Sequence, residues 1–125
     1  MIQFLLDDIL AFHQMLGDTL VMEKGVHDMG LLESAVHAPF QTFAGQELYP
    51  DLCTKAARLC FGITKNHPFV DGNKRTAIHT MLVYLAVNSV ELEYDDDDLE
   101  DTIIAVSSSD MSCDALVKWL KKHIK

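Results

Sequence analysis

The sequence has few of the features that mark exported, membrane or disulfide-bonded proteins. Of its 125 residues only three are cysteine, three are proline and one is tryptophan. Apolar residues make up 49% of the chain, but they are dispersed, and no run approaches the roughly 20 residues that a membrane-spanning helix needs. The N-terminal MIQFLLDDIL has no basic residue and is interrupted by two aspartates, unlike a signal peptide. We expect a soluble, cytoplasmic protein with a single domain, residues 1–125.

The cysteines and histidines do not form a recognisable metal-binding pattern. Three cysteines cannot all pair, and Cys53 and Cys60 lie two helical turns apart in an apolar pattern. Buried free thiols, typical of a reducing cytosol, are therefore expected. The sequence contains no CxxC, HxxxH or HExxH spacing that would favour zinc. Outside the motif described below the histidines are scattered, which indicates structural roles for them: they are His13, His27, His37, His79 and His123.

The charge distribution argues against nucleic acid and in favour of a small anion. The formal net charge is −9, whereas nucleic-acid binding depends mostly on neutralising phosphates. Eight of the nineteen acidic residues lie in ELEYDDDDLED, residues 91–101. Residues 55–75 reverse this balance, with one acid, Asp71, among five basic residues: Lys55, Arg58, Lys65, Lys74 and Arg75. A basic island in an acidic protein favours a small anionic ligand over a duplex.

Apolar periodicity predicts an all-α fold, a compact bundle of about six helices. The predicted helices cover residues 2–16, 30–38, 51–66, 73–87, 98–106 and 113–124. Asp28 and Ser112 are expected to cap two of these helices, and aspartates load the start of the fifth. Residues 89–94 alternate and could form a small strand. Residues 39–50, bracketed by prolines, form a loop or a short hairpin whose length makes it a candidate lid.

The stretch HPFVDGNKRTA, residues 67–77, concentrates the reactive side chains of the chain. A helix that begins at Gly72 or Asn73 would leave its first N–H groups unpaired, which creates an anion site. Gly72 would let a phosphate approach the backbone, and Lys74 and Arg75 would add cationic donors.

Two further side chains of this stretch could supply chemistry. Asp71 is placed to hold a magnesium ion that bridges phosphate oxygens. His67 has the pKa range of a group that accepts a proton from a hydroxyl. An anion cradle, a metal ligand and a general base together form a minimal set for transfer from a nucleoside triphosphate.

Each of these residues also has an ordinary structural interpretation. Asp71 could be only a helix N-cap, Gly72 only a turn residue, and His67 only a hydrogen-bonding group of the loop. Phe69 is expected to anchor the loop in the core. Lys74 and Arg75 could be solvated, although two cations in a first helical turn oppose the helix dipole, a cost that a bound anion would remove.

HPFVDGNKR resembles the signature of the Fic/Doc family, HxFx(D/E)(A/G)N(G/K)R. The sequence meets every fixed position of that signature: His67, Phe69, Asp71, Gly72, Asn73, Lys74 and Arg75. The resemblance extends from GLLESAV to the C-terminal helix and implies a helical bundle with the motif at a loop–helix junction. It also implies roles for the residues. His67 would be the general base and Asp71 the magnesium ligand. Lys74 and Arg75 would take part in catalysis and, with Phe69, Gly72 and Asn73, in binding the nucleotide.

The details of the motif resemble the Doc branch of this family. Fic enzymes usually transfer AMP from ATP to a protein hydroxyl, and their motif has glycine after the asparagine and a second arginine three positions after the first. Here these positions are Lys74 and Ile78. Doc-type toxins transfer the γ-phosphate of ATP to a threonine of elongation factor Tu, because the lysine fills the space of an α-phosphate and the nucleotide binds reversed. The alternatives are AMP transfer and a non-catalytic binding module that acts through the acidic residues 91–101.

The resemblance also concerns the regulation of the protein. Residues 39–50 resemble the flap that lines the target-binding groove in the family. Many Fic proteins carry an inhibitory (S/T)xxxE(G/N) helix. The nearest match here is TLVMEK, residues 19–24, in which a lysine replaces the last position and Glu23 follows a helix end. We interpret this match as chance, and the resemblance then implies control by a separate, Phd-like antitoxin.

Overall fold

The computed structural model describes residues 2–125 and confirms the predicted all-α fold. The described chain contains six α-helices: α1 (Leu6–Thr19), α2 (Met29–His37), α3 (Leu52–Asn66), α4 (Asn73–Val87), α5 (Asp96–Ser107) and α6 (Cys113–Lys122). Between α2 and α3 lie a single turn of 3-10 helix, Ala38–Phe40, and an antiparallel hairpin of β1 (Thr42–Phe43) and β2 (Gln46–Glu47). Within residues 2–125 we find no helix that is long and apolar enough to span a membrane.

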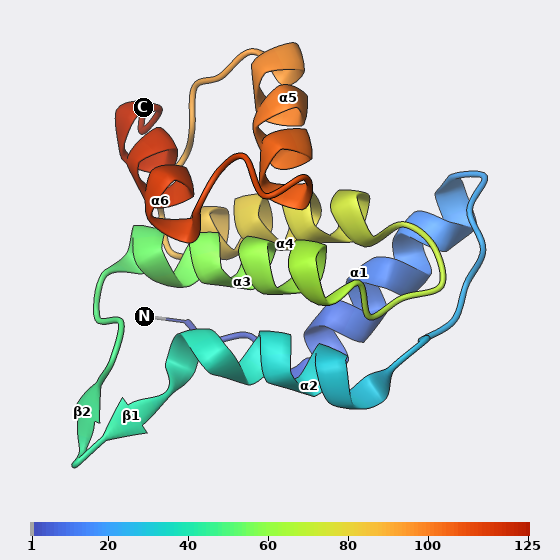
Figure 1. Ribbon diagram of the computed structural model, residues 1–125, viewed down its shortest axis with the longest axis horizontal. Helices are drawn as coiled ribbons and strands as arrows, with labels where there is room; N and C mark the ends of the chain where they lie inside the picture. The colour runs from blue at the N-terminus through green and yellow to red at the C-terminus, as the bar shows by residue number, and fades with distance from the viewer. Residues whose placement is uncertain (1) are drawn as a thin grey trace.

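Helices α3 and α4 form the centre of the bundle (Figure 1). Helix α1 packs on α4, α2 packs on α3, and α5 and α6 cover the side of α3 opposite to α2 (Figure 1). Five fully buried side chains of the two central helices form the middle of the core: Leu59, Cys60, Ile63, Met81 and Leu85. The motif joins these two helices, so the most buried part of the protein positions it.

Side-chain caps set the starts of four helices, and the sequence predicts two of these caps, Asp28 and Ser112. The side chains of Asp28, Asp51 and Ser112 accept hydrogen bonds from backbone N–H groups three residues later, at 3.0–3.1 Å. Asp95 caps α5 in the same way, through the N–H of Asp97 at 2.8 Å. Such caps satisfy N–H groups that a helix cannot satisfy itself, and each contributes about 1 kcal/mol.

Three predictions are wrong, two for the chain ends and one for residues 89–94. The first helix begins at Leu6 rather than at residue 2, because the backbone N–H of Ile2 is held by the side chain of Asn88 at 2.6 Å. Residues 89–94 do not form a strand; only an isolated bridge between Leu92 and Ile124 occurs there. Ile124, expected inside, is 46% exposed.

The segment 39–50 forms the short hairpin that was one of its two expected structures, but it does not reach the motif. The hairpin precedes the N-terminal end of α3, whereas the motif follows the C-terminal end of that helix (Figure 1). Lys55, only 1% exposed, anchors it by donating to the carbonyl of Tyr49 and by pairing with Glu47 at 3.2 Å. Arg58 lies 4.0 Å from the centre of the Tyr49 ring. The predicted basic island is therefore divided, because Lys55 and Arg58 belong to the hairpin anchor.

The three cysteines are buried and unpaired, as expected. Burial raises the pKa of the Cys60 thiol to about 12. These side chains therefore act as small apolar groups of the core.

Candidate active site

The motif forms a tight loop between two residues with left-handed backbone. His67 ends α3 with a φ of 51°, and Gly72 precedes α4 with a φ of 77°. The intervening residues are pinned to the segment after α1, since the N–H of His27 donates to the carbonyl of Pro68 at 2.7 Å and that of Val70 to Gly25 at 3.1 Å. Helix α4 begins at Asn73, one of the two predicted starts.

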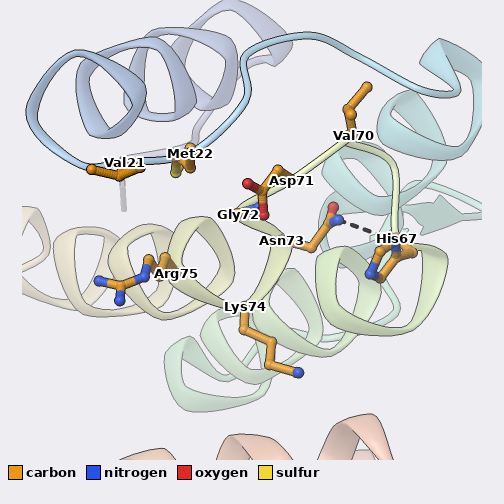
Figure 2. A pocket seen from close by; sticks show the side chains of 9 residues that line it. All are labelled: Val21, Met22, His67, Val70, Asp71, Gly72, Asn73, Lys74 and Arg75. Carbon is orange, nitrogen blue, oxygen red and sulfur yellow. Dashed lines mark hydrogen bonds between the residues drawn. The ribbon is translucent and has the colours of Figure 1, made fainter.

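A cavity of about 270 Å³ opens at this loop (Figure 2). Six of the seven predicted site residues line it, together with Val21, Met22 and Val70: His67, Asp71, Gly72, Asn73, Lys74 and Arg75. Phe69 is the exception. It is 1% exposed and stacks on the ring of His13 in the core, so its place agrees with the anchoring role and offers no direct contact with a bound nucleotide.

Asn73 connects the loop backbone to His67. Its side-chain oxygen accepts the N–H of Phe69 at 2.9 Å, and its nitrogen donates to the carbonyl of the same residue at 2.9 Å. Because the oxygen is engaged in this way, the amide nitrogen also faces Nδ1 of His67, 3.2 Å away. Nδ1 then accepts a hydrogen bond, so a neutral His67 ring carries its proton on Nε2 and Nδ1 is the nitrogen that can take up a proton.

The carboxylate of Asp71 is held by backbone amides on both oxygens. Oδ1 accepts from the N–H of Gly72 at 2.8 Å, and Oδ2 accepts from the N–H of Glu23 at 3.1 Å. The alternative in which Asp71 is only the N-cap of α4 is wrong, because Gly72 occupies that position and no side chain caps the helix. The first-turn N–H groups of α4 are thus left for a ligand, unlike those of α2, α3, α5 and α6.

Glycine at position 72 is favoured by its positive φ and by a close contact with the end of the Met22 side chain, which the sequence did not indicate. A Cβ atom there would lie 2.5 Å from Cε and 2.6 Å from Sδ of Met22. Such distances are far below a van der Waals contact. Met22 and the fully exposed Val21 form the wall of the cavity opposite His67 (Figure 2).

Lys74 and Arg75 are exposed at the first turn of α4 and extend to different sides of it (Figure 2). A second cavity, of about 380 Å³, begins at these two residues and continues between α4 and α5. Apolar side chains line part of it, Ile78, Leu99 and Ile103, and the acidic Asp96 and Glu100 line it as well. The two cations therefore stand between the cavity of the motif and one with a mixed lining.

The site fits a magnesium ion that arrives with a nucleotide. Within residues 2–125 no three His, Cys, Asp or Glu side chains are grouped so that they could hold a metal by themselves. Magnesium is commonly bound by one or two carboxylates together with substrate phosphates. Asp71, exposed in the cavity beside the start of α4, can supply the one protein ligand that this arrangement needs.

His13 lies against the motif, although its place in the sequence indicated only a structural role. It is 4% exposed, and its Nε2 lies 2.8 Å from the carbonyl oxygen of Asp71. Its ring stacks on Phe69 with the centroids 3.8 Å apart and the planes at 5°. The available signal was a histidine within the apolar stripe of the first helix, which does not by itself indicate a partner.

Comparison with known proteins finds relatives that match most of the length of this chain. The family model described as the Fic/DOC family matches residues 3–85. A protein of Mycolicibacterium smegmatis named Toxin Doc is 41% identical over 100 residues, which cover 78% of this chain and 77% of that protein. The Protein kinase doc of Escherichia phage P1 is 28% identical over 98 residues, 78% of this chain and 76% of the relative.

Proposed function

Because the chain belongs to the Fic/DOC family, we propose that it is the toxin of a toxin–antitoxin pair and that it phosphorylates a protein. The reaction would transfer the γ-phosphate of ATP to a serine or threonine hydroxyl. The observation that carries this proposal is the uncapped start of α4, which shares one cavity with Asp71 and His67. The names of the two relatives, a toxin and a protein kinase, agree with it.

The start of α4 would hold the phosphates. Its first N–H groups and the helix dipole favour negative charge, and Lys74 and Arg75 add cations that can reach the same place. Asp71 would hold the magnesium ion, which neutralises charge on the phosphate oxygens. The second cavity, beside Lys74 and Arg75, has apolar lining from Ile78, Leu99 and Ile103 and offers room for the nucleoside, so ATP fits better than inorganic phosphate alone.

His67 would act as the general base. The target hydroxyl oxygen forms a bond to the γ-phosphorus, the bond from that phosphorus to ADP breaks, and the hydroxyl proton passes to Nδ1 of His67. Before the target binds, the Asn73 amide orients the ring through a long hydrogen bond to this nitrogen, at 3.2 Å, and the target hydroxyl then takes the place of that amide at Nδ1. His67 is exposed, which leaves the ring accessible to a protein substrate.

The identity of residue 74 bears on which part of ATP is transferred. Lys74 stands where AMP-transferring relatives have glycine, and Ile78 stands where they have a second arginine. We therefore favour phosphate transfer over AMP transfer. For the target we propose elongation factor Tu, and for the inhibitor a Phd-like antitoxin, both on the resemblance to the Doc branch.

The decisive test measures the intact mass of purified elongation factor Tu after incubation with this protein, ATP and magnesium. A gain of one phosphate that is absent with His67→Ala supports the proposal, provided that the variant unfolds at the wild-type temperature. A gain of AMP would show that Lys74 does not reverse the nucleotide. If neither elongation factor Tu nor any protein in a cell lysate is modified, the non-catalytic alternative is correct.

A further inference from the structure

We infer that His13 is a positioning residue of this site: it fixes the direction of the peptide bond between Asp71 and Gly72, so that an amide and not a carbonyl faces the anion cavity. This inference deepens the proposed function and rests on it for its catalytic consequence. His13 belongs to α1 and lies 58 residues before Asp71 in the chain. It does not line the cavity, but it contacts two residues of the signature, Phe69 and Asp71.

The hydrogen bond from His13 has one possible polarity. The Asp71 carbonyl can only accept, so Nε2 of His13 must carry a proton in either charge state of the ring. The parallel stack on Phe69, at 3.8 Å, fixes the plane of the ring and therefore the direction of this N–H. The two stacked rings are buried, with His13 4% and Phe69 1% exposed. The carbonyl of Asp71 is consequently held towards the core.

A planar trans peptide points its N–H opposite to its carbonyl. With the carbonyl held towards α1, the N–H of Gly72 points outwards, where it meets Oδ1 of Asp71 at 2.8 Å. From the other side, the N–H of Glu23 binds Oδ2 of the same carboxylate. His13 thus holds the backbone of residue 71, and the segment after α1 holds its side chain.

This peptide needs an external restraint because residue 72 is glycine. Rotating the peptide by half a turn changes ψ of Asp71 and φ of Gly72, and glycine populates positive and negative φ about equally. Gly72 now has a φ of 77°. In the rotated form the carbonyl of Asp71 would face the cavity, where its partial negative charge would repel a phosphate. The carbonyl would also lose its hydrogen bond from His13, and the N–H of Gly72 would no longer reach the Asp71 carboxylate. The hydrogen bond from His13 opposes this rotation, because the rotation would leave the buried His13 N–H without its acceptor.

Two substitutions separate this role from simple packing. His13→Phe keeps an aromatic ring on Phe69 but has no donor for the Asp71 carbonyl. His13→Gln keeps an N–H donor but loses the stacked ring. If His13 positions the peptide, glutamine rescues the site and phenylalanine does not, whereas a packing role predicts the opposite order.

The chain provides a matched control at a remote site. His123 also stacks on an aromatic ring, that of Trp119 at 4.0 Å, and its Nδ1 also binds a carbonyl, that of Trp119 at 2.7 Å. His123→Phe removes the same kind of hydrogen bond and keeps the same kind of stack, at the end of α6.

The experiment compares these three variants with wild type in thermal unfolding, in the amide resonance of Gly72 by NMR, and in kcat and KM for ATP. We expect His13→Phe to shift the Gly72 amide resonance and to lower kcat by about 10- to 100-fold, the usual cost of displacing a supporting group. His13→Gln should stay within a few-fold of wild type, and His123→Phe should leave both readouts unchanged.

Two results would overturn the inference: an unchanged Gly72 resonance in His13→Phe, or a folded His13→Gln that is as impaired as His13→Phe. The wild-type imidazole provides a readout that needs no activity, because its ¹⁵N shifts must report the proton on Nε2. If the wild-type protein transfers no phosphate, the proposed function fails, and the Gly72 resonance and the imidazole shifts still decide whether His13 directs the peptide.

Discussion

The amide of Asn73 holds the ring of His67 from inside the protein, with Nδ2 of Asn73 3.2 Å from Nδ1 of His67. Asn73 is 4% exposed and binds both the N–H and the carbonyl of Phe69. A single side chain therefore joins the first turn of α4, the backbone of the loop and the candidate base. This makes the orientation of His67 depend on a residue that a protein substrate does not need to touch.

Replacing Asn73 by alanine should impair both folding and catalysis. The change leaves the backbone groups of Phe69 unpaired in the core, which we expect to lower the free energy of unfolding by about 1–3 kcal/mol. It also frees the His67 ring, so phosphate transfer should fall further than the loss of folded protein explains. Urea unfolding and transfer rates per folded molecule measure the two effects.

Asn88→Ala is the matched control for this prediction. Asn88 also binds backbone on both sides of its amide, the carbonyl of Tyr84 and the N–H of Ile2, but at the far end of α4. Its replacement should lower stability and leave the transfer rate per folded molecule intact. Equal activity losses in the two variants would contradict the role of Asn73 in holding His67.

Gly72→Ala should cost more stability than the same change at Gly45. Both glycines have positive φ, 77° and 80°, so both changes carry the penalty of a left-handed alanine, about 1 kcal/mol. At Gly45 no atom lies within 4 Å of the added Cβ, whereas at Gly72 the terminal atoms of Met22 lie at 2.5 and 2.6 Å. The excess should disappear in the Met22→Ala/Gly72→Ala double variant.

Chemical denaturation of the wild type, Met22→Ala, Gly72→Ala and the double variant gives this comparison as a double-mutant cycle. Gly45→Ala is the reference for the cost of a left-handed alanine. The contact with Met22 is refuted if Gly72→Ala is no less stable than Gly45→Ala. The same set of variants shows whether Met22 limits access to the cavity, since its removal should then strengthen ATP binding.

Lys55→Met should loosen the hairpin without unfolding the protein. The substitution removes the donor to the Tyr49 carbonyl and the partner of Glu47, which are the anchors of residues 42–47. Methionine has a similar length and is apolar, so the buried position remains filled. We expect amide exchange to accelerate in residues 42–49 and to remain slow in α3 and α4.

Lys121→Met serves as the comparison, because Lys121 forms an exposed ion pair with Asp51 at 3.5 Å. Such surface pairs contribute little, and this variant should leave the exchange of the hairpin amides unchanged. Unchanged exchange in the Lys55 variant would mean that Lys55 does not anchor the hairpin.

The stability of the protein should decline as the pH falls below about 6.5 because of His79. Partial burial on α4, edge-on against Phe12, lowers the pKa of His79 from its ordinary value of 6.5. In that range the unfolded chain binds the proton more readily than the folded one, so unfolding takes up protons and acid favours it. The contribution is absent well above pH 6.5 and grows until the pH passes the lowered pKa.

His79→Phe should remove this component. We expect the stability of the variant relative to wild type to increase as the pH is lowered from 8 to 5, measured by denaturant unfolding at each pH. Parallel stability curves for the two proteins would exclude His79 as a source of the pH dependence.

The helix starts and the site signature were predictable because they depend on neighbours in the chain. A cap such as Asp28 or Ser112 acts on an N–H three residues later, and these caps were assigned correctly. The start of α4 at Asn73 followed from the residues before it. The start of α1 was not predictable in this way, because the side chain of Asn88, 86 residues away, fixes the backbone of Ile2.

The basic island shows the opposite case. Lys55 and Arg58 are close to the motif in sequence, but α3 has 15 residues and is therefore about 22 Å long, which places its first turns at the far end of the helix from the motif. There they hold the hairpin. Proximity in sequence along a rigid helix does not bring charges together.

The sequence by itself determined the fold class, the helix boundaries set by caps, and the group of residues from His67 to Arg75, since short-range physics governs all three. Only the tertiary structure decided what surrounds that group. His13 reaches the carbonyl of Asp71 across 58 residues and Glu23 reaches its carboxylate across 48. These contacts exist because α1 packs on α4 beside the motif, and such packing depends on the shape of the whole core.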